Sequence, residues 1–405
     1  MNRLKLSLER DFPVEPIEER ILENYMDEIV NNRRATKQII KVARSEKLTL
    51  EDAIREKCGD YLSKMIGFEN PGLINKLRNK FAWYLNGMFD KISIDEANIE
   101  KIKRCQKEGS VLFLPPHYSH LDYVIKTWVF DKYEIKQPYI AAGSNVWFSK
   151  LKIVDWFFRS FRGFPIDRKK TKKEDILYLA TVKEFTKEIL NQNFSLLIYL
   201  DGSRRKEGYP NCHLKTGGLK AAIEYQKENP QKRIFIAPVI MTYERVPEDY
   251  KFVKETSGEK NHKTPHLANF VYLPFPRNKC GEFSIKFHEP YLLNDYIKND
   301  GGKSDSILAK NLAENVISKI ENSKEITNTQ KIAIDILDYM KEHGEDVPIT
   351  YLVEKRGGDN VNRAGRFFEI NGAINKGAFL WHIKNEKLLE FYKNQAINKY
   401  RTQTL

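Results

Sequence analysis

Two histidines and an aspartate lie within the six residues HYSHLD, from His117 to Asp122, directly after the apolar run VLFL. A carboxylate that hydrogen-bonds one nitrogen of an imidazole fixes its tautomer and raises the basicity of the other nitrogen. A helix is expected to begin at about Ser119, so Asp122 lies one turn in and can point back to His117. We therefore interpret His117 as a general base that takes a proton from a hydroxyl, with Asp122 as its partner.

Two other interpretations of these residues stay open. The spacing Ser119-x-x-Asp122 matches a capping box with Asp in place of Glu, so in the first interpretation Asp122 only caps the helix. In the second, His120 joins His117 and Asp122 as the ligands of a metal ion. No second cluster of ligands accompanies them, so the sequence predicts no metal site. His120 is instead expected to face solvent or substrate.

Clusters of basic residues follow three further apolar runs that have the length of strands. Arg168 follows GFPID, Arg204 and Lys206 follow LLIYLDGS, and Arg245 follows IAPVIMTYE. Arginine suits phosphate because its planar fork of donors can form two parallel hydrogen bonds. Because the clusters repeat at the ends of predicted strands, we expect them to converge on one anionic group.

These motifs lie in a stretch where predicted strands and helices alternate. From about Ile102, short β-branched or aromatic runs such as SVLFLP and FSLLIYL alternate with helical runs such as LDYVIKTWVF. This alternation is typical of an α/β domain, in which ligand sites collect at the carboxyl ends of the strands. We predict an α/β fold whose central mixed, largely parallel sheet is flanked by helices.

The chain is predicted to have three domains. Residues 1–95 carry apolar residues at helical spacing with few strand signals, so they are expected to form an N-terminal helical domain. Residues 96–326 are expected to form the α/β domain. Residues 327–405 are expected to form a C-terminal, mainly helical segment, which is either a small helical domain or an imitation of a winged helix.

The bulk composition limits the class of protein. The chain has 405 residues, of which 41% are hydrophobic, as in ordinary globular proteins, and a net charge of +13 that favours anionic partners. The four cysteines form no C-x-x-C pair, which fits a reducing compartment. Neither a signal peptide nor a run of 18 apolar residues is apparent, so we expect a cytoplasmic protein.

An amphipathic helix is predicted over residues 146–161. On a helical wheel one face collects the apolar residues Trp147, Leu151, Val154, Phe158 and Phe161. A helix at a membrane interface has this pattern, and so does a helix packed on a sheet. Trp156 and Phe157 lie off the main face and favour the membrane. We therefore expect peripheral association with an anionic leaflet, on the cytoplasmic face of a membrane.

The same motifs resemble those of the glycerol-3-phosphate acyltransferase family, within the lysophospholipid acyltransferase superfamily. HYSHLDY resembles the family's His-x4-Asp block, GFPIDR its second block, YLDGSRRKEG its third block (F-x-E-G-x-R-S-R) and APV, with Pro238, its fourth. Four blocks in family order, over about 120 residues, are a specific signal. The resemblance leaves residues 1 to about 95 and 327–405 largely uncovered.

The resemblance implies transfer of a fatty acyl group from acyl-CoA or acyl carrier protein to the sn-1 hydroxyl of glycerol 3-phosphate. In phospholipid biosynthesis this reaction gives lysophosphatidate, and it needs no cofactor beyond the acyl donor. The resemblance also implies that His117 is the base and Asp122 its orienting partner. The residues that would hold the acceptor and its phosphate are Arg168, Asp201, Gly202 and Arg204, with Lys206, Lys215 and Pro238 as further candidates.

This sequence departs from the family's third block at three positions. Asp201 replaces a Glu, Arg205 replaces a Ser, and Lys206 replaces an Arg, which keeps the charge and loses the bidentate fork. Dihydroxyacetone phosphate and a lysophospholipid are therefore alternative acceptors. A non-catalytic relative that binds a membrane or a carrier is a second alternative. No nucleic-acid partner is expected, because the C-terminal segment mixes acidic and basic residues without a basic stripe.

Overall fold

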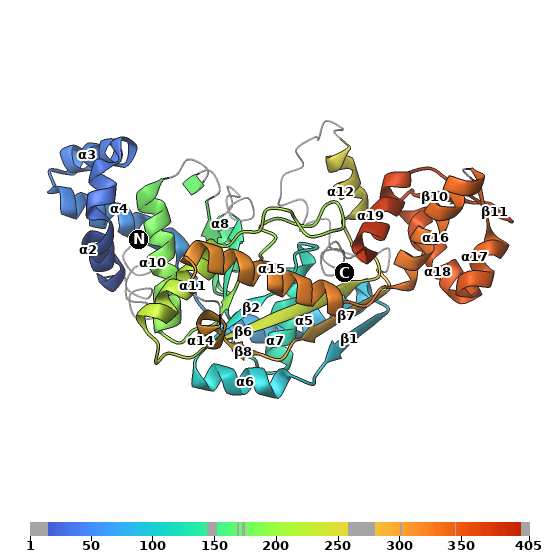
Figure 1. Ribbon diagram of the computed structural model, residues 1–405, viewed down its shortest axis with the longest axis horizontal. Helices are drawn as coiled ribbons and strands as arrows, with labels where there is room; N and C mark the ends of the chain where they lie inside the picture. The colour runs from blue at the N-terminus through green and yellow to red at the C-terminus, as the bar shows by residue number, and fades with distance from the viewer. Residues whose placement is uncertain are drawn as a thin grey trace.

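The chain folds around a central sheet, with the helices of residues 15–65 at one end and a C-terminal lobe at the other in the computed structural model (Figure 1). The structure describes residues 15–143, 152–167, 170–171, 175–257, 280–299, 302–344 and 346–397. The predicted fold class is confirmed, because the sheet is mixed and mostly parallel and helices flank it. None of the described helices has the length and apolarity needed to cross a bilayer.

The central sheet has eight strands, in the order β1-β7-β6-β2-β5-β3-β4, with β8 paired to β6. The strands are Lys91–Asp95 (β1), Ser110–Leu114 (β2), Tyr139–Gly143 (β3), Gly163–Ile166 (β4), Leu196–Leu197 (β5), Ile234–Tyr243 (β6), Glu282–Phe287 (β7) and Tyr291–Leu292 (β8). Strand β6 runs parallel to β2 and antiparallel to β7 and β8. The parallel strands β2 to β6 therefore end at one edge of the sheet, where the sequence motifs lie.

Strand β6 changes partners at Pro238. Its first half pairs with β2 up to the pair Leu114 and Pro238, and its second half pairs with β7 from Val239 onward. A proline has no N–H to donate, so it suits a position where one ladder ends. Residues Val239 to Tyr243 thereby extend past the end of β2, beside the segment that carries His117.

Two hydrophobic clusters lie on the two faces of the sheet. Along β2, Val111 and Phe113 belong to one cluster, and Leu112 and Leu114 belong to the other. This alternation follows from the two-residue period of a strand whose faces are both covered. The helices of the α/β region are Ile99–Glu108 (α6), Leu121–Lys132 (α7), Lys152–Arg159 (α8), Ile176–Asn191 (α10), Gly217–Glu228 (α11), Asp249–Thr256 (α12), Leu293–Lys298 (α14) and Asp305–Ser323 (α15).

Among the described residues, the N-terminal region from residue 15 to residue 88 is mainly helical. Its helices are Glu15–Asn31 (α2), Arg33–Glu46 (α3), Leu50–Met65 (α4) and Pro71–Met88 (α5). Thr49 caps α4 by accepting a hydrogen bond from the N–H of Asp52, and Asn70 caps α5 in the same way. Strand β1 follows within the segment predicted as helical, and it pairs in parallel with β7.

The C-terminal lobe contains three short strands besides its helices. Its elements are Asn328–His343 (α16), Asp346–Pro348 (β9), Ile349–Arg356 (α17), Gly358–Ile370 (α18), Ile374–Lys376 (β10), Leu380–Ile383 (β11) and Glu386–Ala396 (α19). The strands form an antiparallel sheet in the order β10-β11-β9. This order of helices and strands agrees with the winged-helix alternative. The division of the chain into three domains stays a prediction.

Candidate active site

His117 and Asp122 form a buried hydrogen-bonded pair at the end of β2. Pro115 and Pro116 end the strand, and the short segment up to His120 leads into α7. His117 Nδ1 lies 2.8 Å from Asp122 Oδ2. Because an ionised carboxylate only accepts hydrogen bonds, Nδ1 carries the proton, and the lone pair is on Nε2.

Asp122 is fixed by further donors. Its Oδ2 accepts hydrogen bonds from the backbone N–H groups of Tyr118 (2.8 Å) and Ser119 (3.1 Å), and its Oδ1 accepts one from the hydroxyl of Tyr243 (2.7 Å). The contact with the Ser119 N–H is what a capping residue would make. The predicted capping box is formed only in part, because the N–H of Asp122 donates to the carbonyl oxygen of Ser119 and the Ser119 hydroxyl accepts from the N–H of Leu121.

Burial and hydrogen bonding set the charges of the pair. Burial lowers the pKa of His117 from its ordinary value, and the hydrogen bond with Asp122 opposes this effect only in part. Burial alone would raise the pKa of Asp122, but the hydrogen bond from His117 and the charge of Lys126 outweigh it, so that this pKa is lowered. At neutral pH the pair is therefore a neutral imidazole and a carboxylate, the state that a general base needs.

A fully buried lysine lies beneath the pair. Lys126, one turn after Asp122 on α7, donates to the hydroxyl of Tyr199, and its Nζ lies 3.9 Å from the centre of that ring. The Tyr199 ring in turn lies against His117, with ring centres 4.3 Å apart. Burial lowers the pKa of Lys126 to about 7. No salt bridge to Lys126 occurs within the described part of the chain.

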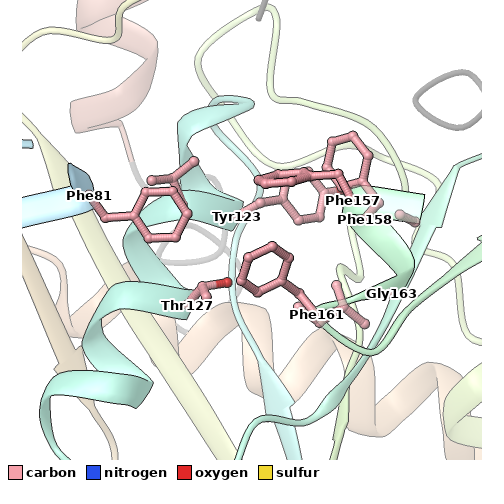
Figure 2. Close-up of a pocket in the computed structure, with 10 residues that line it drawn as sticks. Phe81, Tyr123, Thr127, Phe157, Phe158, Phe161 and Gly163 are labelled. Carbon is pink, nitrogen blue, oxygen red and sulfur yellow. The ribbon is translucent and has the colours of Figure 1, made fainter. Parts of the chain in front are cut away.

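An apolar pocket lies beside Tyr123, the residue that follows Asp122 (Figure 2). Its walls come from α5, α7, α8, β3 and the start of β4. The lining residues are Phe81, Tyr123, Val124, Thr127, Ile140, Ala142, Phe157, Phe158, Phe161 and Gly163. Tyr123 lines the pocket, and its ring centre lies 5.7 Å from the imidazole centre of His117. Such a lining suits an apolar chain.

The loop after β5 brings Asp201 to the backbone of the pair. Asp201 Oδ2 accepts hydrogen bonds from the N–H of His117 (3.2 Å) and from Arg205 Nε (2.9 Å), and its Oδ1 accepts one from the N–H of Asn211 (3.2 Å). Arg205 is fully buried and also contacts Glu321 at 2.5 Å. These contacts engage both oxygens of Asp201 and hold the loop in place.

The other predicted substrate residues differ in their surroundings. Gly202 adopts φ +63°, and an added Cβ there would meet the side chain of Lys215. Lys206 forms a salt bridge of 2.5 Å with Glu255. Pro238 is buried within β6. Arg168 lies outside the described residues.

Arg204 is the predicted phosphate ligand that the structure brings near the pair. Its Nη1 lies 3.1 Å from His120 Nδ1 and 3.9 Å from Glu248 Oε1, and its guanidinium lies over the ring of Phe252, 4.9 Å from the centre. Arg245, from another basic cluster, is instead buried in an ion pair with Asp249 at 3.3 Å.

Glu248 is a site residue that the sequence analysis missed. Its Oε2 accepts from the hydroxyl of Ser119 at 2.5 Å, and its Oε1 lies 3.0 Å from the N–H of His120 and 3.1 Å from His120 Nδ1. Burial raises the pKa of Glu248, but the contacts with His120 and Ser119 outweigh it, so that the pKa is lowered. His120 is thus nearly buried and bound to a carboxylate. The motif after β6 predicted only a basic residue, Arg245, and no local pattern indicated Glu248.

The arrangement can take a proton from a hydroxyl beside an apolar pocket. His117 supplies a basic nitrogen, Asp122 stabilises the imidazolium that forms, and Arg204 supplies a positive charge nearby. Across the ranges that the structure describes, no three His, Cys, Asp or Glu side chains are grouped to hold a metal ion.

The chain is similar in sequence to known acyltransferases. Residues 95–242 match a family model described as Acyltransferase. The chain is 25% identical to mitochondrial glycerol-3-phosphate acyltransferase 1 of Rattus norvegicus over 290 residues, or 68% of this chain and 34% of that protein. It is 25% identical to the Homo sapiens protein of that name over 298 residues, or 70% and 36%.

A bacterial relative matches more of the chain. The chain is 24% identical to the glycerol-3-phosphate acyltransferase of Pseudomonas syringae pv. tomato over 404 residues, or 91% of this chain and 47% of that protein. The chain therefore spans between about a third and a half of the length of these curated relatives.

Proposed function

We propose that this chain is an O-acyltransferase of phospholipid biosynthesis. It is a relative of the glycerol-3-phosphate acyltransferases, as its motifs predicted, and its residues 95–242 match the acyltransferase family model. It transfers a fatty acyl group from acyl-CoA or acyl carrier protein to the sn-1 hydroxyl of glycerol 3-phosphate, giving lysophosphatidate. The observation that carries this proposal is the buried pair of His117 and Asp122, which lies beside an apolar pocket at the end of β2.

The reaction needs only a base and an environment that stabilises charge. In the proposed mechanism Nε2 of His117 takes the proton of the sn-1 hydroxyl while the hydroxyl oxygen attacks the thioester carbonyl. The new C–O bond forms, the C–S bond breaks, and the leaving thiolate takes the proton from the imidazolium. Asp122 stabilises the imidazolium between these steps. A thioester is already activated, so no covalent acyl-enzyme is required.

The acceptor is held by its phosphate in this proposal. Arg204 and Arg168 supply the bidentate donors that a phosphate favours, and Lys206 and Lys215 add positive charge. Both carboxylate oxygens of Asp201 already accept hydrogen bonds within the protein, and Gly202 adopts a left-handed conformation. These two residues therefore shape the loop after β5 and act by positioning Arg204. Pro238 acts in the same indirect way, because it lets β6 extend past β2.

The apolar pocket holds the acyl chain in this proposal. Its lining of aromatic and aliphatic side chains offers no partner to a charged headgroup but buries methylene groups favourably. Tyr123 lines the pocket and its ring lies near His117, so a thioester carbonyl at the mouth of the pocket would lie close to the base.

The product is amphiphilic, so we also propose that the protein binds the cytoplasmic face of an anionic membrane peripherally. The net charge of +13 and the exposed Trp156 on α8, next to the pocket residues Phe157 and Phe158, support this binding. The protein should float with anionic vesicles and lose that binding when salt is raised. Recovery of all the protein in the soluble fraction at low salt would contradict the membrane proposal.

The proposed reaction is tested by offering the purified protein three labelled acceptors with palmitoyl-CoA or palmitoyl acyl carrier protein. We expect labelled lipid from glycerol 3-phosphate. Product from dihydroxyacetone phosphate or a lysophospholipid alone would establish one of the alternative acceptors. The absence of product from every combination would favour a non-catalytic relative.

A further inference from the structure

Helix α12 begins with two neighbouring carboxylates that engage different parts of the molecule. Glu248, at the N-cap position, contacts Ser119 and His120 at the start of α7. Asp249, the first residue of α12, contacts the C-terminal lobe instead. Two consecutive residues thus connect the helix that carries Asp122 with a lobe to which no role has been assigned.

Asp249 is anchored in the C-terminal lobe by several donors. Its Oδ2 accepts hydrogen bonds from the hydroxyl of Tyr392 on α19 (2.5 Å), from Asn371 Nδ2 (2.9 Å) and from Arg245 Nε (3.3 Å). Asp249 and Tyr392 are both fully buried. A buried carboxylate needs such donors, and two of these three, from Tyr392 and Asn371, come from the lobe.

Helix α19 also contacts the loop that carries Arg204. Asn394 Nδ2 donates to the carbonyl oxygen of Glu207 at 2.8 Å. Gly208 approaches α19 so closely that an added Cβ would lie 2.3 Å from the carbonyl oxygen of Phe391. Only glycine permits this approach, and the loop is therefore held directly against the lobe.

A third contact joins α12, α19 and Arg204. The ring of Phe252 on α12 packs against Phe391 on α19, with ring centres 6.2 Å apart, and the guanidinium of Arg204 lies over the same Phe252 ring. Figure 1 shows α12 beside α19, at the junction of the lobe with the rest of the molecule. Arg204 is therefore held by α12, which packs against its guanidinium, and by α19, which holds its loop.

We propose that the C-terminal lobe positions Arg204 for the phosphate of the acceptor, through α19 and the paired carboxylates Glu248 and Asp249. This inference rests on the proposed function, in which Arg204 binds that phosphate. Tyr392, Asp249 and Glu248 are positioning residues, because they act on Arg204 and on the start of α7. A displacement of about 1 Å in such a group is enough to impair binding or catalysis strongly.

The test removes one hydroxyl from the lobe. Tyr392→Phe deletes the hydrogen bond to Asp249 and keeps the ring, and Asn371 and Arg245 continue to hold the carboxylate, so the variant should fold. Tyr351→Phe is the matched control, because its hydroxyl lies in the same lobe and, among the described residues, accepts from Lys355 Nζ at 2.6 Å at the surface. Glu248→Gln is a second variant that leaves the lobe intact.

We expect Tyr392→Phe and Glu248→Gln to raise the Kd for glycerol 3-phosphate, measured by titration calorimetry, by about tenfold, the effect of weakening one charge-assisted hydrogen bond. The KM for the acceptor should rise in parallel, while the KM for the acyl thioester changes less than about twofold. Tyr351→Phe should behave as the wild type. For Tyr392→Phe, the rate at which the protein hydrolyses the thioester without acceptor should equal that of the wild type, because Tyr392 lies in the lobe and outside the site around His117.

Equal acceptor affinity in Tyr392→Phe and Tyr351→Phe would overturn the inference. So would a parallel rise of both KM values with a lower Tm, because this would be a general loss of structure. If the wild type binds glycerol 3-phosphate without acylating it, the proposed function fails while the calorimetric comparison still decides the role of the lobe. If the wild type does not bind glycerol 3-phosphate at all, both proposals fail.

Discussion

Asp122 cannot turn away from His117, because every donor around it holds it in one place. The backbone N–H groups of Tyr118 and Ser119 fix one oxygen, and the hydroxyl of Tyr243 fixes the other. Residue types and spacing were enough to predict this pair, because its members are five residues apart. Glu248 lies 129 residues from Ser119, and no local pattern links the two.

Asp122→Asn should lower kcat about a hundredfold or more, since an amide neither stabilises the imidazolium nor fixes the tautomer of His117. The variant is close in size to the wild type, so its circular dichroism spectrum should be unchanged. Initial rates at saturating thioester and acceptor measure the effect. A rate within threefold of the wild type would mean that Asp122 only caps α7. Tyr243→Phe, which removes a single donor to Asp122, should lower the rate far less.

Lys126 should make the stability of the protein depend on pH. Burial lowers its pKa from 10.5 to about 7, so between these values the unfolded state binds more protons than the folded state. This contribution destabilises the folded state fully below pH 7 and disappears as the pH rises to 10.5. Its full size is on the order of 5 kcal/mol. The double variant Lys126→Met/Tyr199→Phe, which removes both polar partners, should therefore gain more stability at pH 7 than at pH 9.5.

Urea denaturation of the wild type and the double variant at both pH values measures this difference. The free energy of unfolding of the double variant should exceed that of the wild type mainly at pH 7. An advantage of equal size at both pH values would show that Lys126 does not titrate in this window. Single substitution of Lys126 is a weaker test, because it leaves the buried hydroxyl of Tyr199 without its donor.

At the scale of elements, the sheet determines which helices can line the pocket next to His117. Strands β3 and β4 pair in parallel, and α7 and α8 bring their apolar faces over the ends of these strands. The sequence predicted these elements because each is long or strongly apolar. The sequence did not predict β1, a strand of only five residues (KISID) in which polar and apolar residues alternate. Nor did it predict the strands of the C-terminal lobe, which have three or four residues each. Only pairing with distant partners makes such segments strands.

Filling the pocket should shorten the longest acyl chain that the protein uses. Ala142 on β3 lines the pocket, so Ala142→Val and Ala142→Leu should lower the rate with palmitoyl thioester progressively and leave the rate with octanoyl thioester largely unchanged. Extra methylene groups in a packed site cost about 1–3 kcal/mol, so the Tm of each variant serves as a control. An equal loss with both donors would argue that the pocket does not bind the acyl chain.

Over the whole molecule, the hydrophobic core continues from the N-terminal helices into the α/β region. Residues of α2 and α4 share one cluster with α10, α11 and α15, and Arg20 on α2 forms ion pairs with Glu184 and Glu188 on α10 at 3.0 and 2.8 Å. The sequence predicted the helices of this region but not their contacts. Those contacts join segments more than a hundred residues apart, which periodicity does not relate.

Arg20→Leu should lower the free energy of unfolding by about 2 kcal/mol, because it removes one cationic partner from two buried carboxylates on α10. The effect is smaller than for a fully buried pair, since the Arg20 side chain is 30% exposed. Arg55→Leu is the matched control, because Arg55 pairs with the exposed Glu19 and its loss should leave the Tm unchanged. Thermal unfolding of both variants measures the difference, and equal shifts would contradict the shared core.

The most direct test of the proposed base is the formation of labelled lysophosphatidate by the wild type and by His117→Ala. Both proteins are incubated with radiolabelled glycerol 3-phosphate and palmitoyl-CoA, and the lipid phase is extracted and counted. We predict labelled lysophosphatidate from the wild type and a loss of at least about a hundredfold in His117→Ala. Equal product from the two proteins would mean that His117 is not the base and that the proposed mechanism is wrong.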